Sequence, residues 1–109
     1  MKVKTSELKD LALDWAVAMC AGLSHKLHGH IPYSTDWAQG GPIIEREGIS
    51  IVLDWDVVGE FLWGATRIEQ SVVSQAEGTT PLIAAMRCYV ASKLGDEVEI
   101  PDELKGESK

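Results

Sequence analysis

The chain has 109 residues, of which 45% are hydrophobic, and a formal net charge of −7. Because a chain of this length can bury only one hydrophobic core, we expect a single domain over residues 1–100 and a charged, flexible tail over residues 101–109. The acidic excess and the absence of any cluster of Lys and Arg exclude binding to duplex nucleic acid through its phosphates. The charged first residues are followed by no long apolar run, so we expect neither a secretory signal nor a membrane span, and a protein of the cytoplasm.

A first helix is predicted over residues 6–21. Apolar side chains recur there at intervals of three and four residues, Thr5 offers a cap for the helix start, and Gly22 offers a stop. Towards its C-terminal end the helix is apolar around much of its circumference. This pattern predicts packing on two surfaces, one of them a candidate for contact with a second subunit.

A long polar loop is predicted over residues 23–41. The segment is interrupted by Gly, Pro, Ser and Thr and holds three histidines, His25, His28 and His30. Loops of this length are usually functional or mobile. The histidines and the nearby Cys20 raise the question of a metal site, because imidazoles at such spacing can reach one ion. No fourth ligand stands in register, so we prefer a solvated loop and predict no metal site.

A β-hairpin is predicted after this loop. The β-branched run over residues 49–53 is typical of a central strand, and residues 60–68 are long enough to pair with it. Gly64 within the second strand indicates a bulge or a close backbone approach. Residues 70–78 are interpreted as a polar linker.

A second main helix is predicted from Pro81 to about Leu94. Thr80 supplies a cap oxygen, Pro81 has a φ suited to the first helical position, and Gly95 follows the last turn. Residues 98–100 alternate apolar and acidic side chains and are predicted to add a short edge strand. The sequence therefore predicts an α+β fold in which two main helices pack on a small antiparallel sheet within a single domain.

Signals for catalysis are weak throughout the chain. There is no phosphate-binding glycine loop, zinc-protease helix or nucleophile elbow. An acidic pair such as Asp54 with Asp56 is more often a pair of solvated turn residues than of catalytic carboxylates. Cys20 and Cys88 lie in apolar helical surroundings, which favours free buried thiols over a disulfide in a reducing compartment. We therefore expect no enzyme activity and no cofactor.

Three stretches taken together carry a resemblance to a known family. They are residues 12–18 (ALDWAVA), residues 33–45 (YSTDWAQGGPIIE) and residues 80–87 (TPLIAAMR). This set resembles the NinX family of small phage proteins, which are encoded in the accessory region of lambda-like and P22-like phages, and the resemblance covers nearly the whole chain. It implies a phage protein that works in the host cytoplasm, and it implies no particular activity.

The middle stretch is the best candidate for a ligand-binding site, because it places hydroxyl, carboxylate and amide groups beside an aromatic ring on a glycine-rich loop. Trp37 would stack on a flat ring, Asp36 and Gln39 would read its edge, and the glycines would let backbone N–H groups approach a phosphate or carboxylate. Alternatively, Thr35 or Asp36 caps a short turn, Trp37 packs in the hydrophobic core, and the glycines are required only by the backbone geometry of the loop. The candidate residues in this stretch are Tyr33, Ser34, Thr35, Asp36, Trp37, Gln39, Gly40 and Gly41.

Arg87 is the remaining candidate for ligand binding. It stands among apolar residues in the first half of the second helix, where a buried guanidinium needs an acidic or anionic partner. We favour an internal carboxylate such as Asp14 or Asp36, and a bound anion is the alternative. Arg46 and Arg67 are also isolated, so an anionic ligand would be met by a few placed guanidiniums rather than by a basic surface.

These features favour a protein that acts by binding. The leading hypothesis is a phage accessory protein that counteracts host defence by sequestering a small, nucleotide-like signal, in a pocket completed by homo-oligomerisation. The alternative is a protein-interaction module that acts on a host or phage protein of DNA metabolism or defence. The four tryptophans support this alternative, because an exposed Trp on a small protein more often marks a partner surface than a stacking platform.

Overall fold

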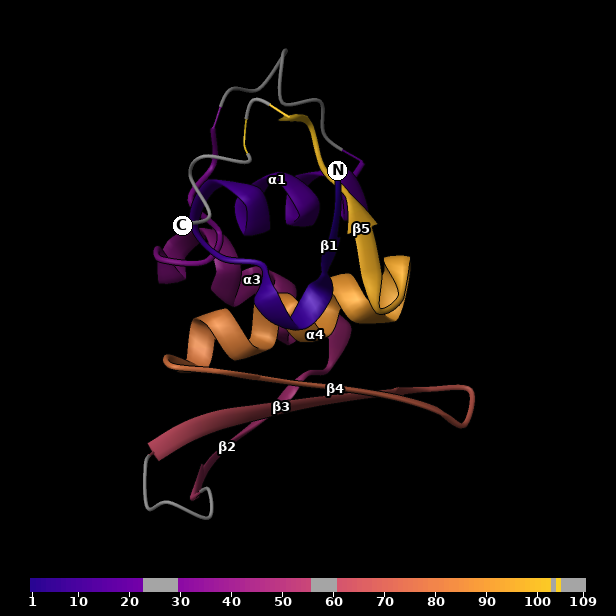
Figure 1. Ribbon diagram of the computed structural model, residues 1–109. Helices are drawn as coiled ribbons and strands as arrows, with labels where there is room; N and C mark the ends of the chain where they lie inside the picture. The colour runs from indigo at the N-terminus through magenta and orange to yellow at the C-terminus, as the bar shows by residue number, and fades with distance from the viewer. Residues whose placement is uncertain (23–29, 56–60, 103, 105–109) are drawn as a thin grey trace.

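The computed structural model describes residues 1–22, 30–55, 61–102 and 104. Its elements form layers around helix α4, Pro81–Leu94 (Figure 1). A three-stranded antiparallel sheet packs on one side of α4, and helices α1, Asp10–Cys20, and α3, Trp37–Glu47, pack on the other. The fold is therefore the predicted α+β class, with α4 as its central element.

The two predicted helix starts have different outcomes. The Thr80 hydroxyl accepts a backbone N–H of the first turn of α4 at 3.1 Å, so this cap is confirmed. The other helix, α1, begins at Asp10, and the prediction that Thr5 caps it is wrong. Thr5 is buried at the start of a short 3-10 helix, η1, Thr5–Glu7, and its hydroxyl donates to the carbonyl of Gly95 at 2.6 Å. That side chain therefore ties η1 to the end of α4.

The sheet contains three strands in the order β2 (Ser50–Trp55), β3 (Phe61–Glu69) and β4 (Val72–Gly78). The predicted hairpin of the first two strands is confirmed. The predicted linker over residues 70–78 is wrong, because most of it forms β4 and pairs with β3. The turn between them, Gln70 and Ser71, contains no Gly, Asn or Pro, so no local turn signal marks the start of β4.

The sheet has one covered face and one free face. Ala65 of β3 is buried towards α4, and residues on alternate positions point the other way. Gly64 pairs in continuous register with Val52 and Glu77, so the sequence-based alternative of a bulge is wrong. We call the face turned away from α4 the outer face; it carries Val52, Leu62, Gly64, Thr66, Ile68, Val73, Gln75 and Glu77.

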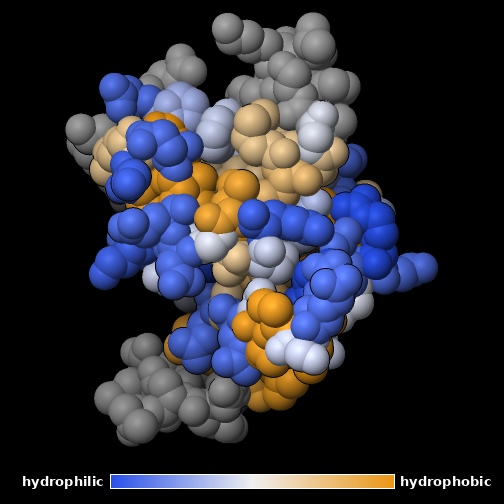
Figure 2. Space-filling view, turned by 90° about the vertical axis from the view of Figure 1, so that its right-hand side faces the viewer, coloured by the Kyte–Doolittle hydropathy of each residue, from blue (hydrophilic) through white to orange (hydrophobic). Residues whose placement is uncertain are grey.

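The hairpin of β3 and β4 ends in exposed apolar side chains. Ile68, Val72 and Val73 are each more than half exposed. Figure 2 views this end of the sheet and shows apolar residues gathered in the lower part of that face. Apolar groups that lie together on a surface often mark a site of contact with another molecule.

A second, two-stranded sheet joins β1, Lys2–Lys4, to β5, Glu97–Glu99. Each lysine stands opposite a glutamate across the pair, and opposite charges on facing strands stabilise the pairing. The predicted strand near residues 98–100 is confirmed, with its bounds one residue earlier. Its partner was not predicted, because three residues from the other end of the sequence carry no local strand signal.

The predicted loop over residues 23–41 is wrong from Trp37 onward, where α3 begins. Asp36 caps α3 by accepting the backbone N–H two residues along at 2.9 Å. Two glycines and a proline lower the helix propensity of this segment, but burial of one helix face, which includes Ile43, outweighs that local preference. Residues 23–29 of the predicted loop lie outside the described residues.

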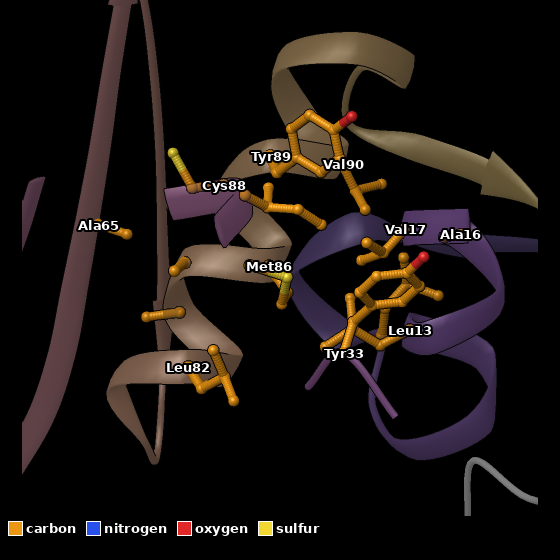
Figure 3. Packing of buried hydrophobic residues seen from close by; sticks show 14 of the residues in the cluster. Leu13, Ala16, Val17, Tyr33, Ala65, Leu82, Met86, Cys88, Tyr89 and Val90 are labelled. Atoms are coloured by element: carbon orange, nitrogen blue, oxygen red, sulfur yellow. The ribbon is translucent and has the colours of Figure 1, made fainter. Parts of the chain in front are cut away.

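The hydrophobic core lies where α1 meets α4. Figure 3 shows Leu13 and Val17 of α1 directed towards Met86 and Val90 of α4, with the Tyr33 ring beside them. Helix α4 is buried around most of its circumference, because it contacts the sheet on one side and helices on the other. Its buried residues are Leu82, Ala84, Ala85, Met86, Cys88, Tyr89 and Val90.

Beyond β5, Leu104 is buried at 8% exposure, and its N–H donates to the carbonyl of Pro101 at 3.0 Å. One apolar residue of the predicted tail thus packs on the domain, and the flexibility of the tail stays a prediction. In the part of the chain that the structure describes, no helix has both the length and the apolar character to cross a membrane.

Candidate functional site

The first two residues of the predicted site are buried and anchor the segment before α3. Tyr33 and Ser34 are 6% and 2% exposed. Asp14 of α1, itself buried, accepts the backbone N–H of Ser34 at 2.8 Å, and its second oxygen lies 2.7 Å from Nε2 of His30. The contacts of Asp14 therefore hold this segment against α1, and they account for a buried carboxylate in an apolar helix.

The next predicted residues belong to the start of α3. Thr35, Asp36 and Gln39 are exposed, and the Asp36 carboxylate is engaged in the helix cap. Gly40 is buried and Gly41 is partly buried within the helix. The sequence-based alternative in which Asp36 serves as a cap therefore describes this residue correctly.

Trp37 lies at the surface of α3 with 53% of its area exposed, so the interpretation that it plugs the core is wrong. It lines a surface hollow of about 640 Å³ together with Pro42, Glu45 and Arg46. We call this the Trp37 hollow. An exposed indole beside a cation and an anion suits either a flat ligand or a protein partner.

Arg87 is half-buried and bonds to the backbone rather than to a carboxylate. Its Nε donates to the carbonyl of Leu8 and its Nη1 to the carbonyl of Glu77, each at 2.8 Å. The favoured internal ion pair with Asp14 or Asp36 is therefore wrong, because both carboxylates are occupied elsewhere. Burial lowers the pKa of Arg87 below its usual value.

The other two arginines have acidic partners. Arg67, 8% exposed, donates from Nη1 to Glu69 and from Nη2 to Glu47, each at 2.7 Å. Arg46 donates from Nε to Glu47 at 2.9 Å. Of the three isolated arginines, Arg87 is thus the one with no carboxylate within 4.0 Å among the residues that the structure describes.

A hollow of about 780 Å³ lies on the outer face of the sheet and extends over the edge strand β4 to Arg87. Its volume lies within the range of about 300–1,000 Å³ that is typical of small-molecule sites. We call it the Arg87 hollow. Gly64 leaves part of its floor without a side chain, and the lining includes Val52, Leu62, Gly64, Thr66, Gln75 and Arg87.

The structure therefore divides the predicted site into two. The Trp37 hollow and the Arg87 hollow share no lining residue. Thr66 and Gln75 were not among the predicted site residues. Gln75 was placed in a linker over residues 70–78, and Thr66 lay in the predicted hairpin, where no sequence signal set it apart. Polar and apolar side chains alternate in that linker only over Gln75, Ala76 and Glu77, which is too short a pattern to mark a strand.

A family model described as Bacteriophage P22, NinX matches residues 4–93. The chain belongs to the NinX family. The match runs from the end of β1 through nearly all of α4, so both hollows of this NinX chain lie within it. A comparison with curated proteins found no match.

The two cysteine thiols of this NinX chain belong to no disulfide and, among the described residues, to no metal-holding group. Cys20 and Cys88 are free, and burial raises the pKa of each thiol to about 11, so both remain protonated at neutral pH. Among the described residues, no three His, Cys, Asp or Glu side chains are grouped to hold a metal ion. His25 and His28, which raised the metal question, lie outside those residues.

Proposed function

We propose that this NinX-family protein acts by binding, without chemistry of its own, and retains a small, nucleotide-like anion in the Arg87 hollow. In this proposal the retained molecule is a signal of host defence, and the protein works in the cytoplasm of the phage host. The proposal is carried by Arg87, a half-buried guanidinium that lines a hollow and has no acidic partner within the described residues.

Arginine chemistry supports a phosphate or carboxylate as the bound group. The contacts to Leu8 and Glu77 use Nε and Nη1, and they hold the guanidinium plane between η1, α1 and β4. A guanidinium held in one orientation can present paired N–H donors to the two oxygens of an anion. Burial strengthens such a contact, because fewer waters compete for the same donors.

The rest of the hollow supports a small molecule rather than a bare ion. Val52 and Leu62 provide apolar surface, and Ser6, Thr66, Gln75 and Glu77 provide polar groups beside it. The Glu77 carboxylate faces the same hollow, so the anionic group must lie towards Arg87 and away from Glu77. Apolar surface lets a pocket bury a small molecule, and polar groups placed beside it fix the orientation of that molecule. Because the net charge of −7 repels an anion, local contacts within the hollow must hold the bound molecule.

Native mass spectrometry tests the proposal directly. The protein is purified from host cells with an active defence system, and its intact mass is compared with its mass after denaturation. We expect a bound small molecule that denaturation releases, and we expect Arg87→Gln to lose it. Lys2→Gln is the control, because it removes the same charge from an exposed side chain that lines neither hollow. Retention by Arg87→Gln would contradict the proposal.

The same experiment tests the two remaining sequence-based predictions. The intact mass gives the number of chains, and so tests the predicted homo-oligomer. Loss of the molecule in Trp37→Ala would show that residues 33–41 also contribute to binding, as the sequence predicts. A clean mass with nothing bound would favour the alternative function, a protein-interaction module, for which the exposed apolar end of the β3–β4 hairpin is the supporting observation.

A further inference from the structure

Gly64 occupies the middle of the central strand, where the fold has no need of a glycine. Its backbone stays in the continuous register of β2, β3 and β4, and its φ is not in the left-handed region. A Cβ added there would meet nothing nearer than the carbonyl oxygen of Val52 at 3.9 Å, which is ordinary contact. Glycine weakens a strand interior, so its presence here calls for another explanation.

The missing side chain leaves a flat area on the outer face. Val52 stands directly opposite Gly64 on β2, and Leu62 follows two residues away on the same face of β3. All three line the Arg87 hollow. A β-branched side chain at this position would stand perpendicular to the sheet and fill the space above the floor.

Polar groups border this flat area along β3 and on β4. Thr66 of β3 and Gln75 of β4 are direct cross-strand partners on the outer face, Glu77 of β4 stands opposite Gly64, and all three line the hollow. The Gln75 amide carries donors and an acceptor, as does the edge of a nucleobase. Arg87 lies at the end of the hollow beyond the β4 edge.

We propose that Gly64 is a specificity-determining residue, forming with Val52 and Leu62 a platform for a planar heteroaromatic ring whose edge is read by Thr66 and Gln75. This inference rests on the proposed function, because the anionic group of the same ligand is the one that Arg87 holds. It narrows the ligand class from a small anion to one that carries a flat base, such as a nucleoside monophosphate.

A graded series at Gly64 separates the platform from the anion contact. Equilibrium dialysis measures the affinity of the wild type, Gly64→Ala and Gly64→Val for AMP, GMP, CMP, UMP and ribose phosphate, which lacks the ring. We expect the wild type to prefer at least one nucleotide over ribose phosphate. Gly64→Val should lower the affinity for that nucleotide by about tenfold or more, and Gly64→Ala should lower it by less. Neither substitution should change the affinity for ribose phosphate.

Two further variants locate the other contacts. Gln75→Ala should alter the preference among the four nucleotides, because it removes the amide that reads the ring edge. Arg87→Gln should lower the affinity for the nucleotides and for ribose phosphate to a similar extent. A thermal melt of Gly64→Val serves as the folding control, and we expect a Tm equal to or above that of the wild type.

The outcomes distinguish the two proposals. If the wild type binds nucleotides and ribose phosphate equally, or if Gly64→Val leaves nucleotide affinity unchanged, the platform is wrong while the anion site at Arg87 stands. If no nucleotide binds, the platform is wrong. If cells in addition yield no bound molecule, the proposed function fails with it. A marked fall in the Tm of Gly64→Val would show that this glycine serves the fold, and would overturn the platform.

Discussion

Gly40 and Gly41 stand side by side in α3 and have different surroundings. A Cβ at Gly40 would lie 2.5 Å from the carbonyl oxygen of Tyr33 and 2.6 Å from Cδ1 of Leu82, closer than packed atoms approach. A Cβ at Gly41 would meet only the Trp37 ring, at 3.9 Å. Packing therefore requires a glycine at position 40, in agreement with the sequence-based alternative that the glycines are needed for geometry. Packing does not require a glycine at position 41.

Alanine substitutions at these two positions should have effects of different size. We expect Gly40→Ala to lower the free energy of unfolding by about 2 kcal/mol, because overpacking outweighs the gain in helix propensity. We expect Gly41→Ala to change it by less than about 1 kcal/mol, because the gain in helix propensity is opposed by Pro42, which disfavours the helical conformation of a preceding residue that carries a Cβ. Urea denaturation of both variants measures the difference. Two changes of the same sign and size would contradict this account of the packing.

At the scale of elements, the turn between β3 and β4 uses residues that are poorly suited to it. Glu69 pairs with Val72, so the loop contains two residues, Gln70 and Ser71, whose φ values are 50° and 70°. Left-handed conformations at both positions define the hairpin turn that Asn-Gly fills best. Other residues there cost about 1 kcal/mol each, and the pairing of β4 along β3 offsets that cost.

The double substitution Gln70→Asn with Ser71→Gly should therefore stabilise the protein by about 1 kcal/mol. The opposite change is available at Gly48, which ends α3 with a φ of 67° and has open space around it. Gly48→Ala should destabilise by about 1 kcal/mol through backbone strain alone. Urea denaturation should give a midpoint above that of the wild type for the double substitution and below it for Gly48→Ala. A double substitution with no effect on the midpoint would contradict the strained left-handed conformations assigned to Gln70 and Ser71.

At the scale of the whole molecule, one carboxylate connects three elements. Glu47 at the end of α3 accepts hydrogen bonds from Arg46 and from Arg67 of β3, and lies 3.9 Å from Nζ of Lys93 in α4. Burial raises the pKa of Glu47, but the hydrogen bond from Arg46 and the charges of Arg67 and Lys93 outweigh burial, so the pKa lies below its usual value. The ionised form thus holds the helical layer to the sheet.

Because the folded pKa of Glu47 is lowered, its contribution is present above its usual pKa of 4.5 and is lost as the pH falls through the folded value. We expect Glu47→Gln to lower the free energy of unfolding by about 1–2 kcal/mol at neutral pH. The loss of stability on acidification should also be smaller in this variant. Chemical denaturation at a series of pH values, with the exposed Glu45→Gln as control, measures both. An unchanged pH dependence in Glu47→Gln would contradict the role of this carboxylate.

The sequence by itself determined the features that are encoded within a few neighbouring residues. The Thr80 cap and Pro81 define the start of α4, the β-branched run places the hairpin of β2 and β3, and three short motifs identify the NinX family. The candidate Arg87 was also found, because a lone guanidinium among apolar residues is visible in the sequence. In each case the physical cause is local, so a short stretch of sequence contains it.

Only the tertiary structure decided α3, β4 and the surroundings of Arg87. The glycines of α3 oppose a helix until burial of one face outweighs their low propensity, and β4 forms because β3 lies beside it. The carbonyl that Arg87 contacts on Leu8 is 79 residues away in the chain, and the hollow arises where Gly64 meets neighbouring strands. Such arrangements depend on packing between distant segments, and no local pattern in the sequence specifies them.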